Sequence, residues 1–172
     1  MNRSDLTGMW DSLRQSTGIA LRCVEAIPAD QLDGHPIPNM RTPREIVVHT
    51  FGSMVRGVAE GALRGEIRTV DEAATRASIR TKEDLIGYCR DCWNAADRAV
   101  AQMTDAHLSA MVKTPWGMEL PGRAALGVIH DEFFHHRGQL YAYLRAMGQD
   151  VPMMWDFEHN APEFRPKARP TA

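Results

Sequence analysis

The sequence predicts an all-α protein, a four-helix bundle with long connections and a short irregular flap before its last helix. Four long segments repeat apolar residues at helical spacing, and none shows the alternation of a half-buried strand. One or two of the connections are long, as crossovers in helix bundles are. We expect residues 1–172 to form a single domain, with a flexible tail over about residues 165–172.

Composition and charge exclude several classes of protein. Hydrophobic residues make up 44% and charged residues 24% of the chain, which is typical of a globular domain. A formal net charge of −2 argues against binding to nucleic acid or to an anionic membrane surface. The first ten residues have no apolar core of a signal peptide, no apolar run reaches the ~18–20 residues that span a bilayer, and three cysteines are too few for a disulfide scaffold. We therefore expect a cytoplasmic protein without a membrane partner.

The first two helices are predicted from their apolar residues and from their ends. The first covers about residues 4–27, and Pro28 lies just beyond it, where a helix normally stops. The second starts at the Thr-Pro-Arg-Glu motif of residues 42–45, in which threonine and glutamate can form a capping box and proline suits the first turn. Its apolar residues continue to about residue 63.

The other two helices are predicted in the same way. The third covers about residues 81–103 and begins with a similar Thr-Lys-Glu-Asp cap. It follows a polar segment, 64–80, which has room for one short helical turn. The irregular flap is expected over residues 104–121, around a Thr-Pro-Trp-Gly turn. The fourth helix covers about residues 122–147, and Gly148 can end it in a left-handed conformation.

The fourth helix carries polar residues within its apolar stripe. At 100° per residue, Glu132 and His136 fall on this stripe, whereas His130, Asp131 and His135 fall outside it. A carboxylate is rarely buried unless it is paired or bound to a metal, and two residues four apart on a helix can present two metal ligands side by side. The stripe itself consists of Leu126, Ile129, Phe133, Leu140, Leu144 and Met147.

Three interpretations of this pair stay open, and plain exposure of the two side chains is the least favoured of them. Glu132 and His136 can form a buried ion pair that fixes the register of the bundle, and spacing alone favours this over a metal site. A third ligand would favour a metal, and His49 on the second helix is the candidate. However, His49 lies away from the apolar stripe of its helix, beside a narrow face of mostly small residues; the stripe consists of Val47, Phe51, Met54 and Val58. The pattern alone therefore indicates a surface histidine.

Two stretches of the sequence resemble a known family. The segment FFHHRGQLYAYLRAMG resembles the H-H-R-G-Q-L segment of the DinB/YfiT-like four-helix bundles, and MRTPREIVVHT resembles their second helix. The family usually binds nickel or zinc through three histidines. The resemblance implies that His49 and His136 are ligands and that Glu132 replaces the middle histidine. Such a set still suits a first-row divalent ion, and the alternative is a site that has lost its metal.

The resemblance also implies a class of function. By its resemblance to the family's enzymes, the chain is expected to be a thiol-dependent transferase or a hydrolase that acts on a small molecule. The nucleophile would be a metal-activated thiol or water, and a low-molecular-weight thiol would be the cosubstrate of a transferase. No catalytic base is identifiable. Gln139 is spaced to hydrogen-bond a ligand, and His135 could substitute for one. The alternative is a non-catalytic binding or regulatory bundle with a relic metal site.

Two helices are apolar over more than one face. The fourth carries Phe134 and Tyr141 opposite its core stripe, and the second carries Val48 and Ala59 at the edge of its own. A bundle helix needs one stripe for its own core, so a second stripe predicts another partner. We expect a homodimer, with coverage by the apolar segment 151–157 as the alternative.

Overall fold

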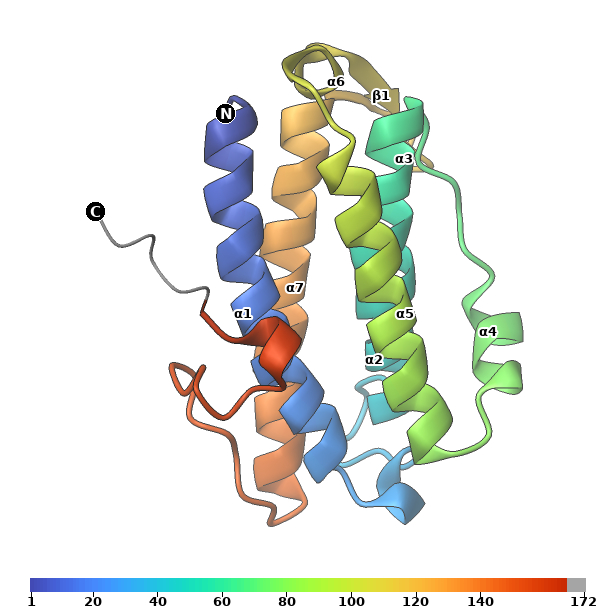
Figure 1. The fold of residues 1–172 in the computed structure, drawn as a ribbon. Coiled ribbons are helices and arrows are strands. Elements are labelled where there is room, and N and C mark those ends of the chain that lie inside the picture. The colour runs from blue at the N-terminus through green and yellow to red at the C-terminus, as the bar shows by residue number, and fades with distance from the viewer. Residues whose placement is uncertain (167–172) are drawn as a thin grey trace.

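The computed structural model describes residues 1–166 and confirms the four-helix bundle. Four long helices lie side by side, and the second of them is built from three consecutive helical segments (Figure 1). The helices of the bundle are α1 (Arg3–Ala26), the continuous run of α2 (Pro43–Val48), η2 (His49–Gly57) and α3 (Val58–Arg64), then α5 (Lys82–Ala101) and α7 (Gly122–Ala146).

The direction of the helices explains the long connection between the second and third of them. Helices α1 and α7 run in one direction, and the α2–η2–α3 run and α5 run in the other (Figure 1). Two consecutive helices that point the same way require a crossover, and segment 65–81 makes it, passing down the outside of the bundle. The short helix α4 (Glu72–Ser78) lies in this crossover and packs against α2 and η2.

The predicted helix starts are confirmed. Thr42 and Glu45 form a reciprocal capping box at the start of α2, with Pro43 as the first helical residue. Thr81 and Asp84 form the same box at the start of α5. These hydrogen bonds satisfy amides that a helix leaves unpaired at its first turn, so the local sequence fixes where both helices begin.

The second helix departs from the regular α-helix that its sequence predicts. Residues His49–Gly57 form a π-helix, in which backbone hydrogen bonds span five residues rather than four. The Thr50 hydroxyl donates to the Ile46 carbonyl oxygen at 2.7 Å. A Cβ at Gly52 would lie 1.9 Å from the Tyr88 hydroxyl oxygen of α5, so only glycine permits this close approach. Met54, which the regular wheel puts on the apolar stripe, lies outside the buried core.

The predicted irregular flap is an ordered helix and hairpin. Helix α6 (Asp105–Ser109) precedes two antiparallel strands, β1 (Met111–Lys113) and β2 (Glu119–Pro121). Lys113 ties the hairpin to the crossover, because its carbonyl oxygen accepts from the Ile67 amide at 2.8 Å and its amide donates to Gly65 at 3.0 Å. The hairpin therefore lies over one end of the bundle in a fixed position (Figure 1).

The C-terminal segment folds back along the bundle. Helix α7 ends at Ala146, and Gly148 directly after its cap adopts a φ of +70°; the chain then returns to α1 through the 3-10 turn η3 (Pro162–Phe164). Another such turn, η1 (Ala29–Gln31), follows α1. The buried Asn160 side chain donates to Gln15 O at 2.9 Å. The predicted flexible tail falls largely on residues 167–172, which lie outside the described residues.

The second apolar stripes are buried within the single chain. Val48 and Ala59 are fully buried, Tyr141 is buried, and Phe134 is partly buried against the core. Val48, Ala59 and Tyr141 therefore do not require a second chain to cover them. Within residues 1–166, no helix combines the length and the apolarity that a bilayer span requires.

Candidate metal centre

Three side chains from two helices converge where α7 packs against η2. His49, Glu132 and His136 each offer one ligand atom, and these atoms all lie within 4.8 Å of one another. The Oε2 oxygen of Glu132 lies 3.2 Å from His136 Nε2 and 4.0 Å from His49 Nε2. The two imidazole rings meet edge to face, with centroids 4.9 Å apart. The sequence-predicted ligand set is thus brought together.

The helices position these groups through the core beneath them. Glu132 and His136 lie one turn apart on α7, and Phe133 lies between them in the sequence. The Phe133 ring packs edge to face on Phe51 of η2, with centroids 6.2 Å apart. This aromatic pair holds the two helices in register, and so brings His49 opposite the pair on α7.

Both imidazoles have their Nδ1 atoms occupied. His49 Nδ1 donates to Glu72 Oε1 at 2.7 Å, and His136 Nδ1 donates to Gln139 Oε1 at 2.7 Å. An acceptor at Nδ1 keeps the proton there, so the Nε2 lone pairs are free and face Glu132. Among the described residues, His136 Nε2 is buried without a hydrogen-bond partner. This is the arrangement that a metal-binding histidine adopts.

The same geometry argues against a simple buried ion pair. The Glu132 side chain is 40% exposed whereas that of His136 is 8% exposed, so the prediction that the helix buries both was wrong for Glu132. Burial lowers the pKa of His136, although the hydrogen bond to Gln139 acts in the opposite direction. A neutral His136 presents a lone pair to the carboxylate, and a cation between the two atoms would satisfy both.

Glu72 is a functional candidate that the sequence did not identify. Its Oε1 oxygen accepts from His49 Nδ1 and from the Ser53 hydroxyl at 2.6 Å, and its other oxygen lies 4.0 Å from Arg41. Burial raises the pKa of Glu72, but hydrogen bonds from Ser53 and His49 outweigh burial and lower it overall. The only feature of the sequence that pointed to this residue was the polarity of segment 64–80. The contact between Glu72 and His49 depends on the path of the crossover, which the sequence does not show.

Gln139 and His135 occupy different places. Gln139 holds His136 through its amide oxygen, and its amide nitrogen lies 3.3 Å from His135 Nε2. The His135 side chain is exposed, and its ring centroid lies 4.9 Å from that of His136. In this arrangement His135 contacts Gln139 and does not join the converging ligand atoms.

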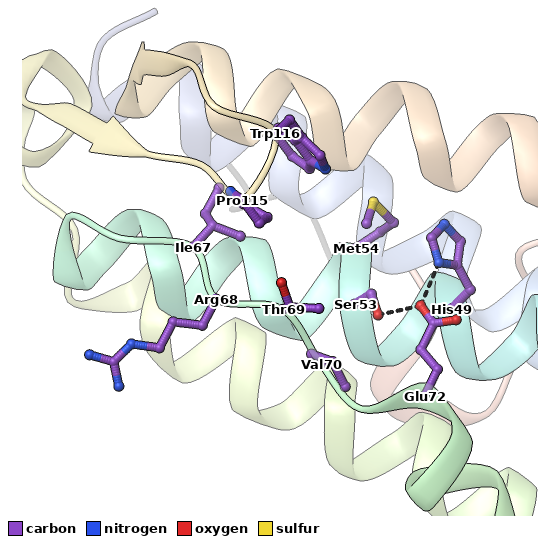
Figure 2. Close-up of a pocket in the computed structure, with 10 residues that line it drawn as sticks. All are labelled: His49, Ser53, Met54, Ile67, Arg68, Thr69, Val70, Glu72, Pro115 and Trp116. Atoms are coloured by element: carbon purple, nitrogen blue, oxygen red, sulfur yellow. Dashed lines mark hydrogen bonds and ion pairs between the residues drawn. The ribbon is translucent and has the colours of Figure 1, made fainter.

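A cavity of about 260 Å³ adjoins the candidate metal centre at His49 (Figure 2). Its walls come from η2, from the crossover and from the turn between β1 and β2. Ser53 and Glu72 lie beside His49 at one end, where dashed lines in Figure 2 mark their contacts. Five other lining residues are apolar, Met54, Ile67, Val70, Pro115 and Trp116, and Arg68 and Thr69 complete the lining.

Residues 12–140 match the family model of the DinB superfamily. The chain belongs to the DinB superfamily. Its fold is similar to that of a DinB-like protein from Bacillus subtilis, with a TM-score of 0.69 and 21% identity over 86% of this chain and 96% of that one. A DinB-like protein from Bacillus cereus has a TM-score of 0.69 and 19% identity over 86% and 95%. No curated protein matches the chain.

Another similar structure carries a description of its own function. YfiT from Bacillus subtilis, described as a probable metal-dependent hydrolase with an unusual four-helix bundle topology, has a TM-score of 0.60. It is 21% identical over 82% of this chain and 87% of its own. At this identity the likeness establishes the shared DinB fold, and function is argued from the site itself.

Proposed function

We propose that this DinB-superfamily protein is a metal-dependent enzyme in which His49, Glu132 and His136 hold one divalent ion. The observation that supports this proposal is how the two imidazoles are hydrogen-bonded and oriented. Both Nδ1 atoms are tied to acceptors, so both Nε2 atoms are free and face the same carboxylate oxygen. The site residues present therefore fit the metal that the family resemblance implies.

The donor set indicates which ions suit the site. Two neutral imidazoles and one carboxylate are borderline and hard donors, which suits zinc and other first-row divalent ions such as nickel. The replacement of the family's middle histidine by Glu132 adds a negative charge and an oxygen donor. Three protein ligands leave coordination positions for a substrate, as catalytic rather than structural zinc sites do.

The chemistry proposed is the activation of a small nucleophile beside a small-molecule substrate. A bound divalent ion lowers the pKa of water or a thiol and polarises a carbonyl. Glu72 and Gln139 fix the tautomer and orientation of the two histidines, and Glu132 lies at the solvent-exposed edge of the site. The description of YfiT favours a hydrolase, and a thiol-dependent transferase remains the other proposed reaction.

Metal analysis of protein purified without a nickel column tests this proposal. We expect close to one equivalent of a divalent ion, either as purified or after zinc or nickel is added back. Less than about one-tenth of an equivalent under both conditions contradicts the proposal. Replacing Glu132 with Gln then distinguishes a metal site from a relic. Metal affinity falls sharply in the first case, whereas in the second the metal content is zero before and after and only stability changes.

The homodimer and the cytoplasmic location remain proposals. The burial of Val48, Ala59 and Tyr141 within the single chain removes the main argument for a partner at those faces. The remaining support for a dimer is Phe134, which is only partly buried. The Arg137 guanidinium carbon lies 4.6 Å from the centroid of its ring. Sedimentation at micromolar concentration tests the dimer, and a species near the 19.3 kDa of one chain contradicts it.

A further inference from the structure

The cavity beside His49 is largely apolar on the side away from the candidate ligands. Trp116, Met54 and Ile67 form much of its surface. Ser53 and Glu72 lie at the His49 end, and Arg68 and Thr69 line the cavity farther from it (Figure 2). The π-helix contributes to this arrangement, because Met54 lies on the cavity wall rather than in the core. A ligand in this cavity therefore meets donors and acceptors at the His49 end and an apolar surface between Trp116 and Met54.

Trp116 is exposed yet held in place by its turn. The Thr114 amide donates to Met118 O at 2.9 Å, and the Gly117 amide donates to Thr114 O at 3.3 Å. Gly117 adopts a φ of +79°, which lets the chain turn directly after the tryptophan. The indole is 46% exposed, and its nitrogen has no hydrogen-bond partner within residues 1–166. In Figure 2 the indole lies above Met54, with the nitrogen toward His49.

Two of the three walls, the hairpin turn and the crossover, are also fixed relative to each other. The hydrogen bonds between Lys113 and residues 65 and 67 join the hairpin to the crossover segment that supplies Ile67 and Val70. The cavity is therefore formed before any ligand binds, which lowers the entropic cost of binding. Its volume of about 260 Å³ lies just below the ~300–1,000 Å³ of pockets for drug-sized ligands, so a smaller ligand fits.

From these observations we infer the class of substrate that the site accepts. The substrate is a small molecule with a metal-binding polar head, which lies at His49, and a compact apolar group, which packs between Trp116 and Met54. This inference rests on the proposed metal-dependent function and extends it, because it assigns specificity to the hairpin turn. The indole N–H of Trp116 is free to donate to a polar atom of the ligand.

Two hydroxamates that differ only in their apolar part test this inference. Acetohydroxamate and benzohydroxamate share one metal-binding head, and only the second carries a compact ring. Isothermal titration into the zinc-loaded protein should give about tenfold or more tighter binding for benzohydroxamate, because the ring buries apolar surface. The Trp116→Ala variant should reduce this ratio to about threefold or less. Trp155→Ala is the matched control, since Trp155 is 67% exposed and does not line the cavity.

The indole N–H signals of the protein in solution provide a second measurement. The chain has four tryptophans, and the Trp116 signal is identified by its loss in Trp116→Phe. Benzohydroxamate should shift the Trp116 signal and leave that of Trp155 in place. Equal binding of both hydroxamates, an unchanged ratio in Trp116→Ala, or a static Trp116 signal at saturation each overturns the inference while the metal centre stands. If the protein takes up no zinc, the proposed metal-dependent function is overturned instead. The substrate's metal-binding head is then overturned as well.

Discussion

The two helices that carry the candidate ligands differ in how well their sequences predict their structures. Helix α7 is regular, and the spacing of its residues correctly places His136 on the buried stripe. The α2–η2–α3 run contains a π-helix, and its spacing wrongly puts Met54 in the core. His49 at the start of this π-helix is held by Glu72 and faces Glu132, although its pattern indicates a surface residue. A helical-wheel projection assumes 3.6 residues per turn, so it predicts the buried face of a helix reliably only where the helix keeps that period.

The cause of the difference lies outside the second helix. Gly52 admits the Tyr88 hydroxyl of α5 against its backbone, and Glu72 of α4 holds both His49 and Ser53. These contacts come from residues more than a dozen positions away in the sequence. Helix α7 keeps the regular α-helical period, and its local pattern places His136 correctly, although it overestimates the burial of Glu132. Wider turns of this kind are frequent at functional sites, where they redirect side chains.

Removing His49 should have the largest effect on zinc affinity. It tests whether His49 is a metal ligand or a surface histidine. The His49→Ala variant should bind zinc about 100-fold or more weakly than the wild type, because one of three ligands is lost. The measurement is competition with a zinc indicator. His130→Ala is the control, since His130 is an exposed histidine of α7 paired with Asp131. If both variants bind zinc as the wild type does, His49 is the surface histidine that its pattern indicates.

Replacing Glu72 tests whether the crossover supports the metal centre. Glu72→Gln removes the charge that holds His49 Nδ1, and zinc affinity should fall by about 10–100-fold. The expected loss is smaller than for His49→Ala because all three ligands remain. Glu66→Gln serves as the control, since Glu66 precedes the same crossover helix but pairs with Arg68 on the surface. A zinc affinity equal to that of Glu66→Gln means that Glu72 does not position the ligand.

The sequence predicted the bundle because its signals are local. Capping boxes at Thr42 and Thr81 fix two helix starts, and apolar spacing fixes the buried faces of α1, α5 and α7. It also singled out Glu132 and His136 by their place on one stripe. It could not supply the partner that holds His49, because Glu72 reaches that residue only through the path of the crossover. The cavity beside His49 depends on the same path and on the hairpin.

Two glycines, one on each ligand-bearing helix, should respond in opposite ways to alanine. Gly52→Ala should lower the free energy of unfolding by about 1–3 kcal/mol, because the new Cβ would lie 1.9 Å from the Tyr88 hydroxyl oxygen. Gly138→Ala on α7 meets nothing within 4 Å and should raise it by about 0.4–1 kcal/mol. Urea denaturation measures both. A Gly52→Ala variant as stable as the wild type would show that the close approach to Tyr88 is not required.

The starts of the two helices should also differ in their response to acid. The first residue of α7 follows Pro121, which provides no side-chain cap, whereas α2 begins with a capping box that depends on a charged Glu45. The hydrogen bond from the Thr42 amide, aided by the paired Arg76 guanidinium, lowers the pKa of Glu45 below its ordinary value of 4.5.

A lowered pKa in the folded state means that the Glu45 carboxylate stabilises the protein above its unfolded-state pKa, and that this contribution is lost as the pH falls through the folded-state pKa. Glu45→Gln keeps the shape of the side chain and removes its charge. It should therefore cost less than about 1 kcal/mol at pH 7, because the paired side chains are still about one-third exposed to solvent, and the difference from the wild type should shrink below pH 4.5. Urea denaturation across this range measures the difference, and one that stays constant with pH contradicts a role for the charge.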